Sequence, residues 1–394
     1  MTSEWRTIRA ADFIDFNPRL SLKKGDIATK VAMDKLKPFT KKIPETEKAE
    51  FNGGAKFCNG DTVMARITPC LENGKTAYVD MLDDGEIGFG STEFIVMRAK
   101  TEISDPQFVY YTAINPVFRN IAIKSMVGSS GRQRVQQSVL EELELSVPDL
   151  DEQRRIGDFL ARIDEKIALN DRINDNLEQQ AQSYFQELFV DNADPEWTTG
   201  TISDLGTVVG GSTPSKAKPE YYTESGIAWI TPKDLSNNKS KFVSHGENDI
   251  TELGLRNSSA SIMPEGTVLF SSRAPIGYIA IAAGEVTTNQ GFKSVVPKPE
   301  IGTPFVYFFL KNTLPVIEGM ASGSTFKEVS GSTMKNVPAV IPDAETLAKF
   351  SDFCAPIFAQ QRILEEQNQS LATLRDNLLP KLMSGEIDVS AVQL

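Results

Sequence analysis

The chain of 394 residues repeats itself after about half its length, and this repeat constrains the fold more than any single motif. Phe-Val-Tyr-Tyr at 108–111 recurs as Phe-Val-Tyr-Phe at 305–308, and Val147-Pro148 recurs as Ile341-Pro342. The two copies agree well at their C-terminal ends and diverge toward their N-terminal ends. We therefore expect two units of the same fold whose front parts differ.

Each copy consists of a globular part followed by a helical part. The globular parts are rich in Gly, Pro and short β-branched or aromatic runs, which is typical of α+β domains with several short strands. The parts that follow carry apolar residues at steps of three and four, which predicts long helices. We place a first globular domain at residues 1–150, a central helix at 151–190, a second globular domain at 191–342, and a C-terminal helix and tail at 343–394.

The two helical segments are expected to pack against each other as an antiparallel coiled coil. The first helix leads from one globular domain to the other, so the second can bury its apolar face only by running back along the first. This arrangement gives an internal pseudo-two-fold repeat with a spacer of about 60 Å, at ~1.5 Å per residue. Pro356 predicts a kink or a later start of the second helix. The apolar positions that define the spacer are Ile156, Ile163, Ile173, Leu177, Leu188, Ile357, Leu364, Leu371, Leu378 and Leu382.

Catalytic signatures are missing, which favours a binding protein over an enzyme. A single histidine, His245, excludes His-based triads and multi-His metal sites. Pro148-Asp149 with Asp164 and Lys166 spells a loose nuclease-like string, but residues on one long helix do not converge on a metal as strand carboxylates do. We predict no catalytic residue and no metal site. A self-contained nuclease and a bivalent protein scaffold without a DNA role remain as alternatives.

The sequence also bears on where the chain works. No run approaches 18 apolar residues and the N-terminal segment has no apolar core, so we expect neither a membrane span nor secretion. The three cysteines, Cys58, Cys70 and Cys354, form no disulfide framework. This pattern predicts a cytoplasmic protein.

The net charge of -12 argues at first against a nucleic-acid partner. Its distribution removes the objection, because residues 151–196 hold 5 basic and 12 acidic side chains and residues 343–394 hold 4 and 8. Residues 1–150 hold 20 and 21, and residues 197–342 hold 12 and 12. The acidity therefore belongs to the helices and the globular domains are close to neutral, so the net charge does not exclude DNA as a partner of the globular domains.

Several strings in the chain resemble the specificity (S) subunit of type I restriction–modification systems. In the first copy they lie at Phe57–Pro69, Glu72–Ala77 and Gly90–Phe94. In the second copy they lie at Gly211–Ser215, Tyr221-Tyr222 and Ala228–Leu235. The helix beginning at Pro148–Ile156 and the tail at Leu379–Ile387 complete the resemblance, which covers nearly the whole chain.

The resemblance implies a non-catalytic subunit that recognises double-stranded DNA. Each globular part is then a target-recognition domain that reads one half of a split sequence, and the helices act as a spacer that docks two methyltransferase (modification) subunits. Restriction/translocase subunits join the complex. S-adenosylmethionine, ATP and Mg are expected in those partners, with no cofactor in this chain. Only the second domain has the Gly-Ser-Thr-Pro-Ser string at 211–215, which indicates that the two domains belong to different subclasses. The target is therefore expected to be asymmetric.

Candidate DNA contacts are basic and small polar side chains in loops, since phosphates are bound by Lys and Arg and bases are read by polar side chains. Arg66 and Arg273 occupy equivalent positions of the repeat. In the first domain the candidates are Lys35, Lys37, Lys41, Lys42, Arg66, Ser129, Arg132 and Arg134. In the second domain they are Thr213, Ser215, Lys216, Lys218, Lys233, Arg273, Ser324 and Lys327.

The spacer hypothesis makes a length prediction. Inserting four residues near Asn170, with a matching insertion in the second helix, lengthens the spacer by ~6 Å. This is nearly two base pairs at ~3.4 Å each, so the gap between the two half-sites should widen. Single-molecule sequencing of methylated bases in cells that carry the chain and its modification partner measures that gap. An unchanged gap would contradict the spacer role.

Overall fold

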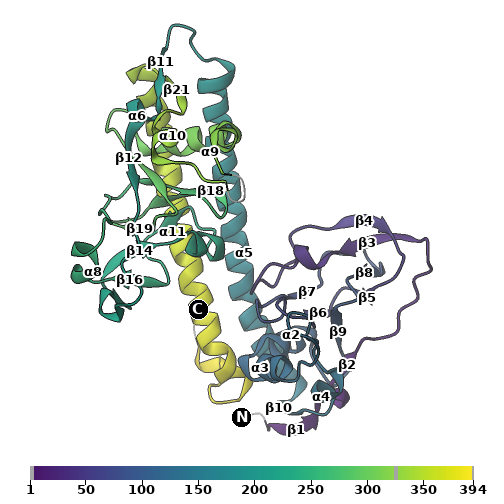
Figure 1. Ribbon diagram of the computed structural model, residues 1–394. Helices are drawn as coiled ribbons and strands as arrows, with labels where there is room; N and C mark the ends of the chain where they lie inside the picture. Colours follow the sequence, from purple (N-terminus) through teal and green to yellow (C-terminus); the bar gives the residue numbers. More distant parts are fainter. Residues whose placement is uncertain (1–3, 324–326, 393–394) are drawn as a thin grey trace. The chain divides into compact units, whose positions relative to one another are not determined.

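The computed structural model describes residues 4–323 and 327–392, which form two compact units (Figure 1). Of these residues, unit 1 contains 4–169 and 368–392, and unit 2 contains 170–323 and 327–367. Among the described residues, none of the helices is both long enough and apolar enough to cross a lipid bilayer.

Two long helices contribute to both units. They are α5 (Leu150–Gln186), which ends in a π-helical turn at Glu187–Asp191, and α11 (Ala344–Met383). The side chain of Asp149 caps α5 by accepting a hydrogen bond from the N–H of Glu152 at 2.9 Å. The expected long helices are therefore confirmed. The later start at Pro356 is wrong, because α11 begins at Ala344 and runs through the proline.

Unit 1 is built on two four-stranded sheets and one strand pair (Figure 1). The first sheet is antiparallel with the order β2-β9-β6-β7. The second has the order β4-β3-β8-β5, with β3 and β8 parallel, and β1 pairs with β10. The strand bounds are β1 Arg6–Arg9, β2 Ile14–Phe16, β3 Ile27–Val31, β4 Glu47–Glu50, β5 Ala55–Phe57, β6 Thr62–Ala65, β7 Thr76–Tyr78, β8 Gly88–Gly90, β9 Phe94–Ala99 and β10 Glu144–Val147. The short helices are α1 Ala10–Phe13, η1 Met33–Lys35, α2 Pro106–Ile114, α3 Pro116–Lys124 and α4 Gln137–Glu141.

Unit 2 contains a five-stranded sheet, β12-β20-β17-β18-β15, a four-stranded sheet, β13-β16-β14-β19, and the pair β11-β21. Its strands are β11 Thr198–Thr201, β12 Gly206–Gly210, β13 Tyr222–Thr223, β14 Ile227–Ile230, β15 Phe242–Val243, β16 Asn248–Ile250, β17 Val268–Ser272, β18 Ile276–Ala282, β19 Thr287–Thr288, β20 Lys293–Pro297 and β21 Pro338–Ile341. Its helices are α6 Ile202–Leu205, η3 Pro219–Tyr221, α7 Pro232–Asn237, α8 Glu252–Arg256, α9 Thr303–Met320 and α10 Gly331–Lys335.

The two units repeat the same succession of elements. The order β2-β9-β6-β7 corresponds to β12-β20-β17-β18, and the parallel pair β3–β8 corresponds to β14–β19. The aromatic string that repeats in the sequence lies on α2 and α9, where its residues are buried. In unit 1 these residues share a core with Ile156 and Leu160 of α5 and with Leu382 of α11. The repeated string is therefore the part of each unit that packs on the long helices.

The long helices run antiparallel where they meet within each unit. In unit 1, Arg375 of α11 pairs with Asp164 of α5 at 2.6 Å, and both side chains are almost fully buried. In unit 2, Gln361 of α11 donates to the carbonyl of Asn174 at 3.2 Å, and the rings of Tyr184 and Phe353 are 4.5 Å apart. Of the expected spacer positions, Ile156, Ile163, Ile357, Leu364 and Leu382 are buried and Ile173, Leu177, Leu188, Leu371 and Leu378 are partly buried.

Among the described residues, each unit buries one lysine against aromatic rings beside α5. Lys41 contacts the hydroxyl of Tyr111 at 3.3 Å, and this hydroxyl donates to Asp164 at 2.6 Å. Lys41 is only 8% exposed, so its prediction as a DNA contact is contradicted by its burial. A lysine in a basic loop interrupted by Pro38 is expected at the surface, but the chain turns Lys41 inward, where the ring faces and the carboxylate stabilise its charge.

In unit 2 the buried lysine is Lys241. Its ammonium pairs with Glu178 of α5 at 2.5 Å and lies 3.8 Å from the ring centroid of Phe358. The backbone N–H groups of Lys241 and Phe242 donate to the carboxylate of Glu365 on α11, at 2.8 and 3.0 Å. Glu365 thereby holds the edge strand β15 against α11.

Burial lowers the pKa of Lys41 to about 8, below its ordinary value near 10.4. As pH rises from about 8 to about 10, the folded protein loses this proton before the unfolded chain does, so the free energy of unfolding should increase. We expect Lys41→Met to abolish that increase and to stabilise the protein at pH 7 by roughly 1–3 kcal/mol, because the cost of burying the ammonium is then removed.

Urea unfolding of the full chain at pH 7 and pH 9.5 measures this effect. Lys42→Met is the matched control, since Lys42 is the exposed neighbour. A Lys41→Met protein that keeps the pH dependence of the wild type would contradict the assignment.

Candidate nucleic-acid interface

Unit 1 has a cleft of about 580 Å³ with a basic lining. Its cations are Arg19 from the segment after β2, Lys56 from β5 and Arg66, which directly follows β6. Among the described residues that line this cleft, none is acidic. Basic groups without a competing carboxylate favour an anionic ligand.

Local structure fixes the walls of this cleft. Asn17 adopts a positive φ of 50°, and its side-chain carbonyl accepts a hydrogen bond from the N–H of Val96 at 2.9 Å, which anchors the turn that leads to Arg19. Arg66 donates from Nη2 to the carbonyl of Val135 at 3.2 Å, whereas its buried Nε has no hydrogen-bond partner among the described residues. Lys56 donates to the carbonyl of Leu20 at 2.9 Å.

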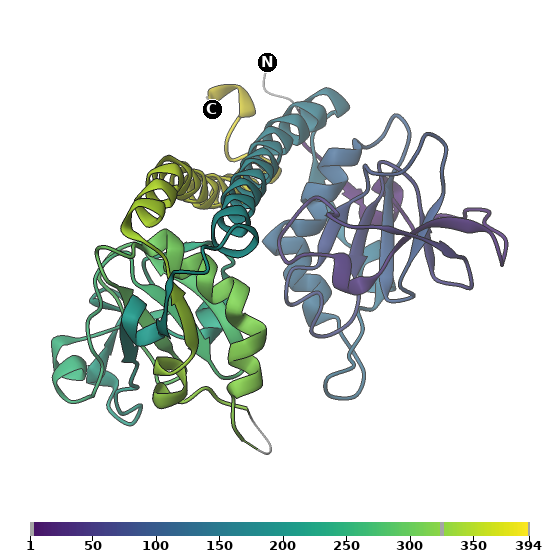
Figure 2. The ribbon, with the colours of Figure 1, turned by 90° about the horizontal axis from the view of Figure 1, so that it is seen from above.

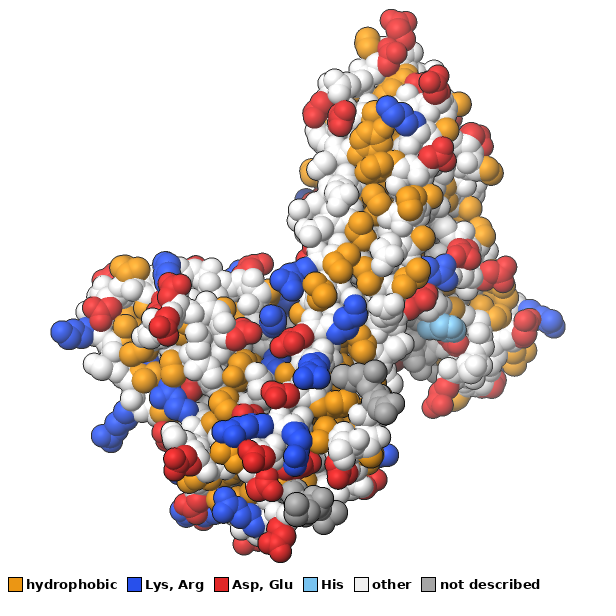
Figure 3. Space-filling model, turned by 180° about the vertical axis from the view of Figure 1, so that it is seen from behind, with side chains coloured by type: hydrophobic (Ala, Val, Ile, Leu, Met, Phe, Trp, Pro, Cys, Tyr) orange, Lys and Arg blue, Asp and Glu red, His pale blue; other side chains and the backbone are white. Residues whose placement is uncertain are grey.

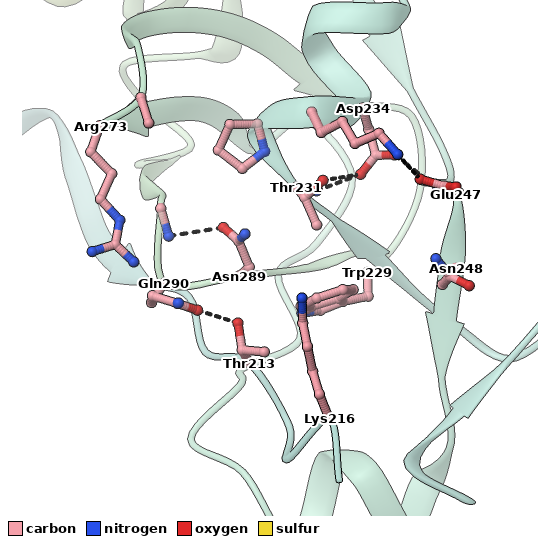
Figure 4. Close-up of a pocket in the computed structure, with 14 residues that line it drawn as sticks. Thr213, Lys216, Trp229, Thr231, Asp234, Glu247, Asn248, Arg273, Asn289 and Gln290 are labelled. Atoms are coloured by element: carbon pink, nitrogen blue, oxygen red, sulfur yellow. Dashed lines mark hydrogen bonds and ion pairs between the residues drawn. The ribbon is translucent and has the colours of Figure 1, made fainter. Parts of the chain in front are cut away.

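Unit 2 has a cleft of about 450 Å³ with a more mixed lining (Figure 4). Thr213 and Lys216 come from the segment after β12, Arg273 follows β17, and Gln290 lies in the turn after β19. Figure 4 shows these side chains around the cleft together with Asn248 from β16. Arginine and side-chain amides are the groups that pair with base edges.

Hydrogen bonds preorganise the unit 2 cleft. The Thr213 hydroxyl donates to the side-chain carbonyl of Gln290, which orients the amide. Asn289 accepts from the N–H of Gly291 at 2.8 Å and so shapes the same turn. Asp234 is occupied by the N-terminal cap of α7, where it accepts from the N–H and hydroxyl of Thr231. Asp234 is therefore structural.

The two clefts lie at the same place in the repeated fold. Each takes residues from the segment after β2 or β12, from the turn after β8 or β19, and from the arginine at the end of β6 or β17. Arg66 and Arg273 are equivalent, as the sequence predicted, and each lies close to a cis X-Pro bond. The fold thus supplies one cleft per unit, and the loops supply a different lining to each.

The predicted candidates differ in where they lie relative to the two clefts. Thr213, Lys216, Lys233, Arg273 and Arg66 line the two clefts. Ser215 and Lys218 are exposed on the same segment as Thr213 and Lys216, while Lys327 lines a neighbouring pocket with Arg273. Ser324 lies outside the described residues.

The remaining unit 1 candidates lie away from the cleft lining. Lys35 pairs with Glu45 and Lys42 lies 3.9 Å from Asp80, while Lys37 is exposed. Ser129 and Arg132 are exposed on the loop at 127–134, which projects from the body of unit 1 (Figure 2). Arg134 at the base of this loop is held by Glu93 at 2.6 Å.

Several cleft residues are not among the candidates predicted from the sequence. Arg19 and Lys56 in unit 1, and Asn248 and Gln290 in unit 2, come together only through the pairing of distant strands. Phe94 and Phe292 are buried aromatic residues at equivalent positions after the two turns. Gln290 lies two residues before Phe292, as Thr92 lies two residues before Phe94, so this alignment indicates Gln290 as a cleft residue.

The nuclease alternative finds no support at Asp164. This carboxylate is buried, pairs with Arg375 at 2.6 Å and accepts from Tyr111 at 2.6 Å. Both of its oxygens therefore serve the packing of α5 against α11 and the body of unit 1.

Comparison with known proteins agrees with the repeat. A family model for the type I restriction modification DNA specificity domain matches residues 3–179 and 195–374. The specificity subunit of the type I restriction enzyme MjaIX from Methanocaldococcus jannaschii is 39% identical over 47% of this chain and 45% of that protein. The chain thus spans less than half of that relative.

Two further relatives match over most of their length. The HindI specificity subunit from Haemophilus influenzae is 25% identical over 83% of this chain and 86% of that protein. The crystal structure of the type I restriction–modification S subunit from M. genitalium covers 96% of both chains with a TM-score of 0.59 at 18% identity, which shows a shared fold. Since the family model covers both halves, the chain belongs to the type I restriction–modification DNA specificity domain family and carries two copies of its domain.

Proposed function

We propose that the chain is the DNA sequence-recognition subunit of a type I restriction–modification complex. The observation that carries the proposal is that each copy of the family domain has a cleft at the same place, built by the same three segments. Each cleft offers cations for phosphates and polar groups for base edges. The chain is a non-catalytic subunit, in keeping with relatives that are named specificity subunits.

The target is double-stranded, bipartite and asymmetric. Unit 1 offers Arg19, Lys56 and Thr92, whereas unit 2 offers Lys216, Asn248 and Gln290. Because side chains read bases through their own donors and acceptors, different linings select different half-sites. Each target-recognition domain, at residues 1–150 and 191–342, reads one of them.

The long helices act as spacer and scaffold. They form an antiparallel coiled coil that relates the two domains by a pseudo-two-fold axis, and the apolar positions from Ile156 to Leu382 define it. On these helices Leu169, Phe353, Ile363 and Leu374 are 39–48% exposed, and Figure 3 shows a band of hydrophobic side chains on one face of unit 2. Exposed apolar side chains on acidic helices suit contact with protein better than contact with DNA.

The partners follow from this assignment. Two modification subunits dock on the helices, and restriction/translocase subunits complete the assembly in the cytoplasm. S-adenosylmethionine, ATP and Mg are used by these partners, and methylation and cleavage take place on them.

Gln290→Ala tests the division of labour between the clefts. Removal of the amide should relax one base position of one half-site, at a cost of about 1–3 kcal/mol in discrimination. The other half-site and the gap should stay unchanged. Single-molecule sequencing of methylated bases, in cells that carry the variant and its modification partner, reads both half-sites at once.

Arg19→Gln in unit 1 is the reciprocal variant, and it should change only the other half-site. If either variant altered both half-sites, or if the methylated sequence were not bipartite in the wild type, the proposed function would be wrong.

A further inference from the structure

Beside the unit 2 cleft, two cations share one carboxylate. Glu328 lies between Arg273 and Lys293, with one oxygen 3.4 Å from Nη1 of Arg273 and the other 3.8 Å from Nζ of Lys293. Arg273 lines the cleft, and Lys293 lies on β20 and donates to the carbonyl of Gln290 at 3.4 Å. Arg273 is therefore part of the cleft wall, and Lys293 contacts the turn that carries Gln290.

The two cations need an anion between them. The side chain of Lys293 is 16% exposed, and burial together with the charge of Arg273 lowers its pKa, while the charge of Glu328 opposes this. Here each cation lies near a different oxygen of the same carboxylate. An arginine and a lysine can bind two oxygens of one phosphate in the same way. The carboxylate of Glu328 thus has the charge and the arrangement of oxygens that a DNA phosphate would present.

Unit 1 provides an internal comparison, because it has the opposite polarity at the equivalent place. Arg134 corresponds to Glu328, since each pairs in a β-bridge across the base of its loop, with Val127 and Ser322 respectively. Arg134 holds Glu93, which directly precedes β9, through several hydrogen bonds. In unit 1 the loop therefore supplies the cation and the body supplies the anion, so the arrangement in unit 2 is not required by the fold.

We propose that Arg273 and Lys293 form a phosphate-binding site for the DNA backbone, and that Glu328 occupies it in the free protein. The inference rests on the proposed function and assigns the chemistry of one side of the unit 2 cleft. Glu328 must leave when a phosphate enters, so it competes with DNA and lowers the affinity of this domain. No bond is made or broken beyond this exchange of ion pairs.

Glu328→Gln tests the competition with DNA. In complex with the modification partner, this variant should bind duplex DNA about two- to fivefold more tightly than the wild type, since an ion pair no longer has to be broken. In an Arg273→Gln/Lys293→Met background the same substitution should have no effect. That double variant should also make the fall of log K with log salt shallower by about one, because the one phosphate contact of this site is lost.

Glu318→Gln is the matched control. Glu318 lies on α9 and lines the same pocket as Arg273 and Glu328, so its substitution changes the net charge by the same amount at nearly the same place. Within the described part of the chain, however, Glu318 forms no ion pair with a cation. An equal gain from Glu318→Gln, or a gain from Glu328→Gln that persists without Arg273 and Lys293, would overturn the proposal.

A second readout needs no DNA. With inorganic phosphate as the probe, millimolar concentrations should raise the melting temperature of the Glu328→Gln chain and leave that of the wild type and of Glu318→Gln unchanged. Equal shifts in all three would contradict a site at Arg273 and Lys293. If the wild-type complex bound DNA without sequence preference, the proposed function would fail, and the phosphate measurement would still decide whether the anion site exists.

Discussion

The amphipathic character of α5 is the constraint on which the structure depends. This helix of 37 residues carries apolar positions in both of its halves. Since a helix in a protein gains most of its stability from packing of its apolar face, α5 must be covered along its length. The chain meets this need with α11, which comes from the other end of the sequence, and with the aromatic helices α2 and α9. Each unit is therefore assembled from segments that are far apart in the chain.

Charged groups make this packing specific. The buried pair Asp164–Arg375 contributes little net stability when compared with apolar side chains of similar size, but it would be costly to break. Together with Lys41 and Tyr111 it links the body of unit 1 to both helices. Lys241 and Glu178 serve the same purpose in unit 2 with different residues. Both units therefore bury a lysine beside α5, and the residues that surround this lysine differ between them.

The repeat, the long helices and the equivalence of Arg66 and Arg273 were all within reach of the sequence, because periodic apolar residues and recurring strings report core packing directly. The cleft linings were not, because Arg19, Lys56 and Gln290 become neighbours of the arginines only through strand pairing. Lys41 shows the opposite error, since a lysine next to other charges was expected in solvent. Its burial depends on three tyrosine rings contributed by β7 and α2.

The contact of Glu365 with β15 has a consequence for solubility. β15 ends the five-stranded sheet, and an uncovered edge strand offers unpaired N–H and C=O groups to any other extended chain. By accepting both N–H groups at Lys241 and Phe242, one carboxylate on α11 occupies the donors that a foreign strand would use. The helix that covers α5 therefore also protects the sheet of unit 2 against intermolecular β-pairing.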